Sequence, residues 1–224
     1  MIQLIIFDMD GTLYDLNDVV SSNYEMQVEF LEIKTGKDRA SIVSFLEENH
    51  IYPVMKNDSK SATELFSRLG YDMQEWTDFR EEHFDISAID ISKAVGNDCI
   101  EELATEYQLF LLSSNSYKNI KSVLSHIGIS ASNFSSIVCS DTFAKESQFD
   151  KRTAIQNISE TSGIPYSNMI SIGDRYMTDI KPMLELGGRG ILLFSPDSMK
   201  RVKEDLISER LENCHDYDYY KSLS

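Results

Sequence analysis

The sequence predicts an α/β protein: a Rossmann-like parallel sheet core with helices on both faces, plus a small all-helical cap domain. From about residue 93 onward, short apolar runs alternate with segments whose apolar residues recur at helical spacing, as in parallel sheets. Residues 15–92 show helical patterns and no convincing strand, and they are too long to be a loop. We therefore predict an α/β core of residues 1–14 and 93–224 and a helical cap of residues 15–92.

The first strand is predicted over residues 2–7, a short and mostly apolar run that ends in a turn. Helical spacing begins near Leu16 and continues to Gly36. Three shorter helices follow in the cap, centred on residues 42–46, 62–69 and 73–79. Trp76 and Phe79 are expected to belong to the cap's own hydrophobic core.

Beyond residue 93, strands and helices are predicted in turn. Four more strands are indicated by short apolar runs, at residues 109–112, 136–139, 169–172 and 191–194. Helical patterns lie between them, and glycines at their ends are typical helix terminators. Ser195-Pro196 is typical of a helix start and opens the last helix. The Tyr-rich tail of residues 213–224 is interpreted as a surface or edge-strand segment.

Composition indicates a soluble globular protein and restricts its partners. The 224 residues are 42% hydrophobic and 26% charged, which suits one sizeable core or a core with a smaller domain. The net charge of −16 argues against nucleic acid and membrane partners, because both attract basic patches. A small anionic substrate stays compatible, since one local cation is enough to hold it. We expect a monomer or a weak dimer.

Cysteine usage and the first residues indicate a cytoplasmic protein. Cys99, Cys139 and Cys214 are far apart and odd in number, which is typical of reduced thiols. The segment MIQLIIFDMD has no basic region, and its apolar run is too short for a signal peptide. No apolar window approaches the length of about 18 residues that a membrane span needs.

Polar residues follow three of the predicted strands: Asp8 and Asp10 after the first, Ser114 and Asn115 after the second, and Asp174, with Asp179 further on, after the fourth. In parallel α/β sheets, ligands bind at the carboxyl ends of the strands. We therefore expect Asp8, Asp10 and Asp174 to converge there, with Ser114 beside them.

Several carboxylates in one crevice repel each other, and one of them would rise in pKa unless a cation is present. Ligands that offer only oxygen suit a hard ion, above all Mg²⁺. Mg²⁺ takes one or two carboxylates, waters and a substrate phosphate oxygen, which leaves a second carboxylate free for acid–base or nucleophilic chemistry. The four histidines show no ligand spacing, so a zinc site is not expected.

Three segments resemble motifs of the haloacid dehalogenase superfamily and occur in that family's order. FDMDGTLYD resembles the first motif, DxDGT. LLSSN is similar to the second, a Ser or Thr followed by Asn, and IGDRYMTD to the fourth, two acids five residues apart. The resemblance implies the phosphatase branch with a helical cap after the first motif, similar to phosphoglycolate phosphatase-like and pyrimidine nucleotidase-like proteins. It also implies small phosphorylated metabolites as substrates.

The resemblance implies roles for the acidic residues. Asp8 would be the nucleophile that attacks phosphorus. Asp10 would protonate the leaving oxygen and then activate the water that hydrolyses the aspartyl-phosphate. Mg²⁺ would lie between the carboxylate of Asp8, the main-chain carbonyl of Asp10 and Asp174. Asp179 would orient a lysine or a metal-bound water.

The resemblance implies supporting roles as well. Ser114 and Asn115 would bind the substrate phosphate, Ser114 through a hydrogen bond to a phosphoryl oxygen. Gly11 and Thr12 would form the turn through which the chain leaves the first strand for the cap. Ser114 would equally suit an ordinary loop, since serines after strands are common.

The third motif of the family is a lysine that binds the phosphate and the nucleophile, and here it has two candidates. No Lys-Pro pair precedes the fourth motif, so the choice lies between Lys145 and Lys151. Lys151 is favoured, because it opens the predicted 151–162 helix. The helix dipole disfavours a cation in that first turn, so an anion would have to hold it there. Lys145 lies in a predicted loop from which it would also reach inward.

Several interpretations stay open. Taken alone, Asp8 and Asp10 would suit a strand-end turn, and Asp174 would suit a helix N-cap. The favoured function is a Mg²⁺-dependent phosphatase. The alternatives are a phosphomutase or dehalogenase on the same fold and a non-enzymatic binding protein. Asp10 argues against dehalogenase chemistry, which needs no acid to protonate an alkoxide, and the complete set of carboxylates argues against a binding protein.

Overall fold

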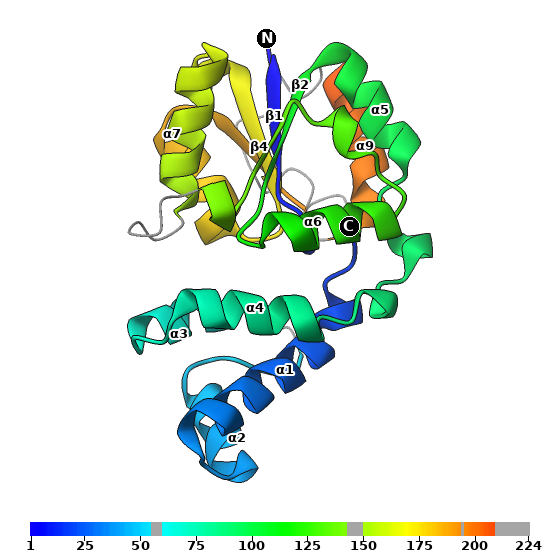
Figure 1. The fold of residues 1–224 in the computed structure, drawn as a ribbon. Helices are drawn as coiled ribbons and strands as arrows, with labels where there is room; N and C mark the ends of the chain where they lie inside the picture. Colours follow the sequence, from blue (N-terminus) through cyan, green and yellow to red (C-terminus); the bar gives the residue numbers. More distant parts are fainter. Residues whose placement is uncertain (55–59, 143–149, 194, 209–224) are drawn as a thin grey trace. The chain divides into compact units, whose positions relative to one another are not determined.

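The structure of the chain, a computed structural model, describes residues 1–54, 60–142, 150–193 and 195–208. Two compact units make up the chain: a sheet unit of Met1–Asp15 and Asp90–Ser224, and a cap unit of Leu16–Ile89 (Figure 1). Lys145, Phe194, Cys214 and the Tyr-rich tail lie outside the described residues.

A five-stranded parallel sheet forms the centre of the sheet unit, in the order β3-β2-β1-β4-β5. The strands are β1 (Leu4–Phe7), β2 (Gln108–Leu112), β3 (Ser136–Val138), β4 (Met169–Gly173) and β5 (Arg189–Leu192). All four residues of β1 are buried, as expected for a central strand that helices cover on both faces. The register pairs Phe7 with Leu111 and with Ile172, so β1, β2 and β4 end at the same edge.

The prediction of a parallel α/β sheet is confirmed, but the bounds of two strands were wrong by two residues. The last strand was expected over 191–194, whereas β5 covers Arg189–Leu192, because Arg189 pairs with Ile170 of β4. Main-chain pairing, rather than side-chain hydrophobicity, therefore sets where this strand begins. The first strand was expected from residue 2 and begins at Leu4.

In the described part of the sheet unit, the α-helices are α5 (Asn97–Glu106), α6 (Tyr117–His126), α7 (Lys151–Ser162), α8 (Lys181–Glu185) and α9 (Met199–Ile207). On one face of the sheet, Leu4 and Ile6 pack with Ile155 of α7 and Met183 of α8. Figure 1 shows α7 on one side of the strands and α5 with α9 on the other. Helices therefore cover both faces, as the sequence predicted.

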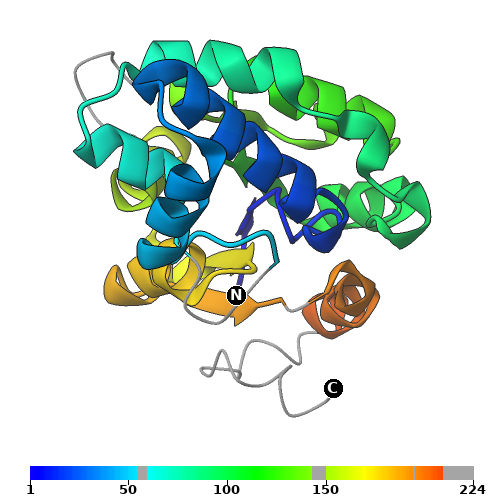
Figure 2. The same ribbon diagram turned by 90° about the horizontal axis from the view of Figure 1, so that it is seen from below.

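The cap unit consists of helices, as predicted: α1 (Asn17–Thr35), α2 (Arg39–Glu48), α3 (Ala62–Arg68) and α4 (Met73–His83). Figures 1 and 2 show α1 packed along α2 and α4. Phe30 stacks on Phe66 with ring centroids 5.3 Å apart, and Trp76 is buried beside them. Trp76 and Phe79 thus belong to the cap's own core, as expected. No helix in the described ranges is long and apolar enough to cross a membrane.

Candidate active site

Strand β1 delivers Asp8 to the carboxyl edge of the sheet. The Asp8 N–H still donates to the Ile172 carbonyl (2.9 Å), so the strand pairing fixes its backbone. The side chain is 9% exposed. Burial raises the pKa of Asp8 well above its ordinary value, and neighbouring carboxylates add to the effect against the opposing charge of Lys151.

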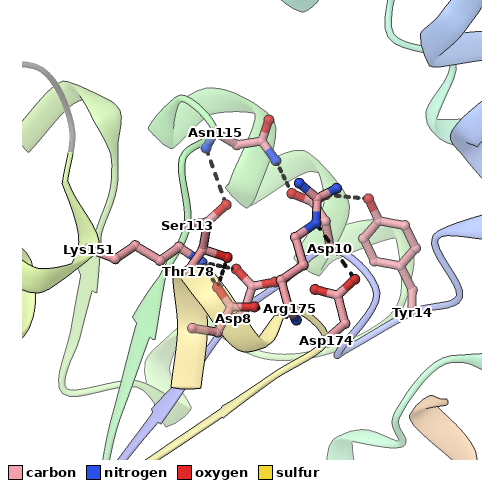
Figure 3. Close-up of polar contacts among 10 residues, drawn as sticks. Asp8, Asp10, Tyr14, Ser113, Asn115, Lys151, Asp174, Arg175 and Thr178 are labelled. Carbon is pink, nitrogen blue, oxygen red and sulfur yellow. Dashed lines mark hydrogen bonds and ion pairs between the residues drawn. The ribbon is translucent and has the colours of Figure 1, made fainter. Parts of the chain in front are cut away.

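Lys151 reaches this edge from the first turn of α7. The N-cap residue, Asp150, accepts a hydrogen bond from the Thr153 N–H (2.9 Å) and fixes the start of the helix. The Lys151 ammonium donates to Asp8 Oδ1 at 2.6 Å (Figure 3). It also donates to Asp179 Oδ1 at 2.7 Å. Burial disfavours the ammonium, but the two carboxylates outweigh it and raise the pKa of Lys151. Lys151 therefore stays charged.

Asp179 is held by two further contacts within the loop that follows β4. The chain there forms a single π-helical turn over Tyr176–Ile180. Asp179 Oδ2 accepts from the Arg175 N–H (2.9 Å), and Oδ1 accepts from the Thr178 hydroxyl (3.0 Å) as well as from Lys151. With its oxygens engaged in this way, Asp179 is placed to orient Lys151.

Asp8, Asp174 and Asp179 form an acidic cluster in which each offers one carboxylate oxygen within 4.8 Å of the others. Asp174 Oδ1 is buried and has no hydrogen-bond partner within the described part of the chain. Burial raises the pKa of Asp174 to about 7, with Arg175 Nε, 4.0 Å away, acting in the opposite direction. An unpartnered carboxylate oxygen among like charges is the donor that a hard divalent cation binds, so these residues fit a metal site.

Two glycines let these carboxylates approach the backbone. Gly11 has φ of +80°, and a Cβ at this position would lie 2.5 Å from Asp174 Oδ2. A Cβ at Gly173 would lie 2.4 Å from the Cβ of Asp179. The DGT and IGD segments therefore need glycine for steric reasons. Thr12, beside Gly11, is fully buried, and its hydroxyl has no hydrogen-bond partner among the residues described.

The Asp10 side chain has different hydrogen-bond partners from those of the acidic cluster. The Tyr14 hydroxyl donates to Asp10 Oδ1, and Asn115 Nδ2 donates to Asp10 Oδ2 at 2.6 Å. Figure 3 shows these two side chains reaching Asp10 from different sides. The two aspartates of the DMD segment therefore have different partners: a lysine for Asp8, and two uncharged donors for Asp10.

Comparison with known proteins now identifies the family. The sequence profile of the haloacid dehalogenase-like hydrolases matches residues 5–187 of the chain. The chain belongs to this family. No curated protein matches the sequence.

Solved structures share the fold of this haloacid dehalogenase-like hydrolase at low identity. A haloacid dehalogenase-family phosphatase from Thermococcus onnurineus is 13% identical over 90% of this chain and 97% of its own, with a TM-score of 0.61. CbbY from Rhodobacter sphaeroides, in complex with phosphate, is 16% identical over 87% and 88%, with a TM-score of 0.55. The hydrolase YfnB from Bacillus subtilis, bound to magnesium, is 15% identical over 91% and 99%, with a TM-score of 0.52.

Ser113, in the LLSSN segment of this haloacid dehalogenase-like hydrolase, was not predicted as a site residue. Ser114 was expected at the site, but its side chain is exposed, whereas Ser113 is fully buried. The Ser113 hydroxyl accepts from the Asn115 N–H (3.2 Å), and Figure 3 shows Ser113 among the residues of the site. One signal was available: Ser113 directly follows the last residue of β2, just as Asp8 directly follows the last residue of β1.

Tyr14 was also missed as a site residue. The sequence analysis included it in the FDMDGTLYD segment and gave it no role. The structure does bury it fully, but with its hydroxyl on Asp10. A buried tyrosine hydroxyl usually has a polar partner, but the sequence shows only a Tyr four residues after Asp10 and does not show that it is buried.

Proposed function

We propose that this protein is a Mg²⁺-dependent phosphatase that hydrolyses phosphate monoesters of small metabolites through an aspartyl-phosphate on Asp8. One observation carries the proposal. Asp8 and Asp10 lie at the same sheet edge, yet Asp8 is bound to a lysine within an acidic cluster and Asp10 to two uncharged donors. Two carboxylates in different environments are suited to two different roles.

Asp8 is the nucleophile of the proposed reaction. Its backbone is fixed by β1, and Lys151 holds one of its carboxylate oxygens, so the other is free to be directed at phosphorus. Lys151 is itself anchored by Asp179 and would also bind a phosphoryl oxygen. Mg²⁺ held by Asp8 and Asp174 would neutralise charge on the nucleophile and on the phosphoryl group.

Asp10 is the acid and then the base. In the first half of the reaction, an Asp8 oxygen bonds to phosphorus, the bond to the leaving oxygen breaks, and the Asp10 proton moves to that oxygen. In the second half, Asp10 takes a proton from the water that attacks phosphorus, and the Asp8–phosphorus bond breaks. Ser113, at the same sheet edge, would donate its hydroxyl to a phosphoryl oxygen.

The ligands of two similar structures support this choice of metal and substrate group. The Bacillus subtilis protein is bound to magnesium, and the Rhodobacter sphaeroides protein is in complex with phosphate. Both share the fold that places Asp8 and Asp174 at one edge of the sheet. The metal assignment rests mainly on this chain's own residues, since oxygen-only ligands favour Mg²⁺ over softer ions.

The proposal is tested by measuring free phosphate released from a panel of sugar phosphates, phosphoglycolate, nucleoside monophosphates and 4-nitrophenyl phosphate. We expect release with Mg²⁺ and none with a chelator. Asp8→Asn should abolish turnover, because an amide cannot act as the nucleophile. Asp98→Asn makes the same chemical change at an exposed position of α5 and should leave turnover unchanged. Near-full activity of Asp8→Asn would refute the mechanism.

A sugar phosphomutase is the alternative that uses the same two aspartates. It would convert a sugar phosphate into an isomer without releasing free phosphate. Product analysis of the same panel separates the two, because the phosphatase proposal requires stoichiometric phosphate. Ranking the panel by kcat/KM then identifies the leaving group that the enzyme prefers.

A further inference from the structure

The feature that carries a further inference is the pair of hydrogen bonds on Asp10. Tyr14 is fully buried, Asn115 is 5% exposed, and each donates to a different oxygen of the Asp10 carboxylate (Figure 3). Neither donor is charged. The carboxylate is therefore fixed in orientation by two groups that come from different segments of the chain.

Backbone geometry brings Tyr14 to Asp10. The left-handed conformation of Gly11 turns the chain, and the Met9 carbonyl accepts from the N–H groups of Thr12 (3.2 Å) and Leu13 (2.9 Å). Tyr14 thereby returns beside Asp10, with which its backbone forms an isolated bridge. The Val95 N–H donates to the Leu13 carbonyl (2.9 Å) and ties the loop to the rest of the sheet unit.

We infer that Tyr14 is a positioning residue for Asp10 and directs its proton to the leaving group. The inference rests on the function proposed above, in which Asp10 is the general acid. An amide nitrogen can only donate, so Asn115 keeps Asp10 Oδ2 as an acceptor, and the transferable proton belongs on Oδ1. A carboxyl oxygen keeps a lone pair when it is protonated, so the Tyr14 hydroxyl can go on donating to Oδ1 while the Oδ1 proton points to the leaving oxygen.

The consequence is a dependence on the leaving group. A nitrophenolate leaves readily without a proton, whereas an alkoxide needs one as its bond to phosphorus breaks. Loss of the Tyr14 hydroxyl should therefore harm alkyl esters far more than nitrophenyl esters. A residue that only supports packing would affect both classes equally. The value of kcat/KM is the right measure, because it reports the steps up to transfer of the phosphoryl group to Asp8.

The experiment compares wild type, Tyr14→Phe and Tyr107→Phe on ethyl, phenyl and 4-nitrophenyl phosphate with Mg²⁺. Tyr14→Phe keeps the buried ring and removes only the hydroxyl. Tyr107→Phe is the matched control, since its hydroxyl donates to the Leu206 carbonyl (2.9 Å), far from Asp10 in the sequence. Thermal unfolding of all three proteins verifies that each is folded.

For Tyr14→Phe we expect kcat/KM to fall by at least about tenfold on ethyl phosphate and by less than about threefold on 4-nitrophenyl phosphate. The larger loss is part of the 10²–10⁴-fold that a positioned general acid contributes. Tyr107→Phe should show no dependence on the leaving group. An equal loss on all three esters, or no loss on any, would overturn the role of Tyr14 while leaving the phosphatase proposal intact. Inactivity of the wild type on every ester would overturn both.

Discussion

Replacing Asp174 by asparagine should stabilise the metal-free protein at alkaline pH. Burial raises the pKa of Asp174 in the folded chain to about 7, against an ordinary value of 3.8. Because the folded pKa lies above the unfolded one, the contribution of Asp174 to stability is fully present below about pH 4 and is lost as pH rises through about 7. Asparagine has a similar shape and no charge, so it avoids this loss.

The magnitude follows from the size of the shift. About three pKa units correspond to roughly 4 kcal/mol at full ionisation. The Asp174 side chain is 14% exposed, and its ionisation is coupled to that of Asp8 and Asp179. We therefore expect about half of this free energy, ~2 kcal/mol. For a chain of this length, that difference in unfolding free energy corresponds to a Tm difference of about 4–8 °C.

The assay is thermal unfolding of wild type, Asp174→Asn and Glu160→Gln at about pH 5 and about pH 8, with chelator and with Mg²⁺. Glu160→Gln is the control, because this carboxylate is exposed on α7. With chelator, Asp174→Asn should exceed wild type in Tm at the higher pH and match it at the lower one. Mg²⁺ should raise the Tm of wild type and not that of Asp174→Asn, since a ligand that binds only the folded state stabilises it.

Two outcomes would refute this reasoning. If Asp174→Asn were less stable than wild type in chelator at about pH 8, the ionised carboxylate of Asp174 would not lower the free energy of unfolding as its burial indicates. If the Tm difference were the same at both pH values, it would not arise from ionisation of Asp174. The assignment of Asp174 as a metal ligand is refuted separately, if Mg²⁺ raises the Tm of Asp174→Asn as much as that of wild type.

Five further substitutions, two of them for comparison, test the geometry of the site. Gly11→Ala places a Cβ 2.5 Å from a metal-site oxygen at a φ of +80°, so we expect about 1–2 kcal/mol of strain and loss of the Mg²⁺-dependent Tm shift; an unchanged shift would contradict this. Lys151→Met leaves buried carboxylates unpaired and should lower the unfolding free energy by about 3–5 kcal/mol and abolish turnover, while Lys145→Met should do neither. Equal, small losses from both would disprove the lysine assignment. Ser113→Ala should lower kcat/KM by roughly tenfold and Ser114→Ala by less than about twofold; the reverse order would restore Ser114 as the phosphate ligand.

The sequence predicts the parallel sheet and the meeting of its acids because both depend on local patterns. Asp8 follows an apolar run, and Asp174 follows another after a glycine, so the ends of two strands are visible in the sequence. The rule that parallel strands end at one edge then brings the two acids together without any knowledge of packing. The structure places them in one cluster with Asp179.

Sequence reasoning fails where one residue of register matters. Ser113 and Ser114 are identical side chains at adjacent positions, and successive side chains at a strand end point in different directions. The end of β2 at Leu112 decides that Ser113 is buried and Ser114 exposed. Apolar patterns locate a strand end only to within a few residues, which is too coarse for this choice.

Contacts between residues that are distant in the chain also cannot be predicted from local sequence patterns. The two bonds of Lys151 join residues 143 and 28 positions away in the chain, and no local pattern specifies either. The helix dipole requires an anion beside a lysine in the first turn of a helix, but it does not specify which anion. The structure supplies Asp8 and Asp179.

Burial of three carboxylates at the sheet edge lowers the stability of the metal-free protein, and binding of a cation there would restore it. Asp8, Asp174 and Asp179 are buried together, and in the described site Lys151 is the only buried cation among them. In the metal-free protein, burial and the neighbouring carboxylates raise the pKa values of Asp8 and Asp174. Any cation that binds there offsets the repulsion among the carboxylates, so this repulsion contributes directly to metal affinity. Asp10 is held by uncharged donors instead, so its orientation is set before a cation or a substrate arrives.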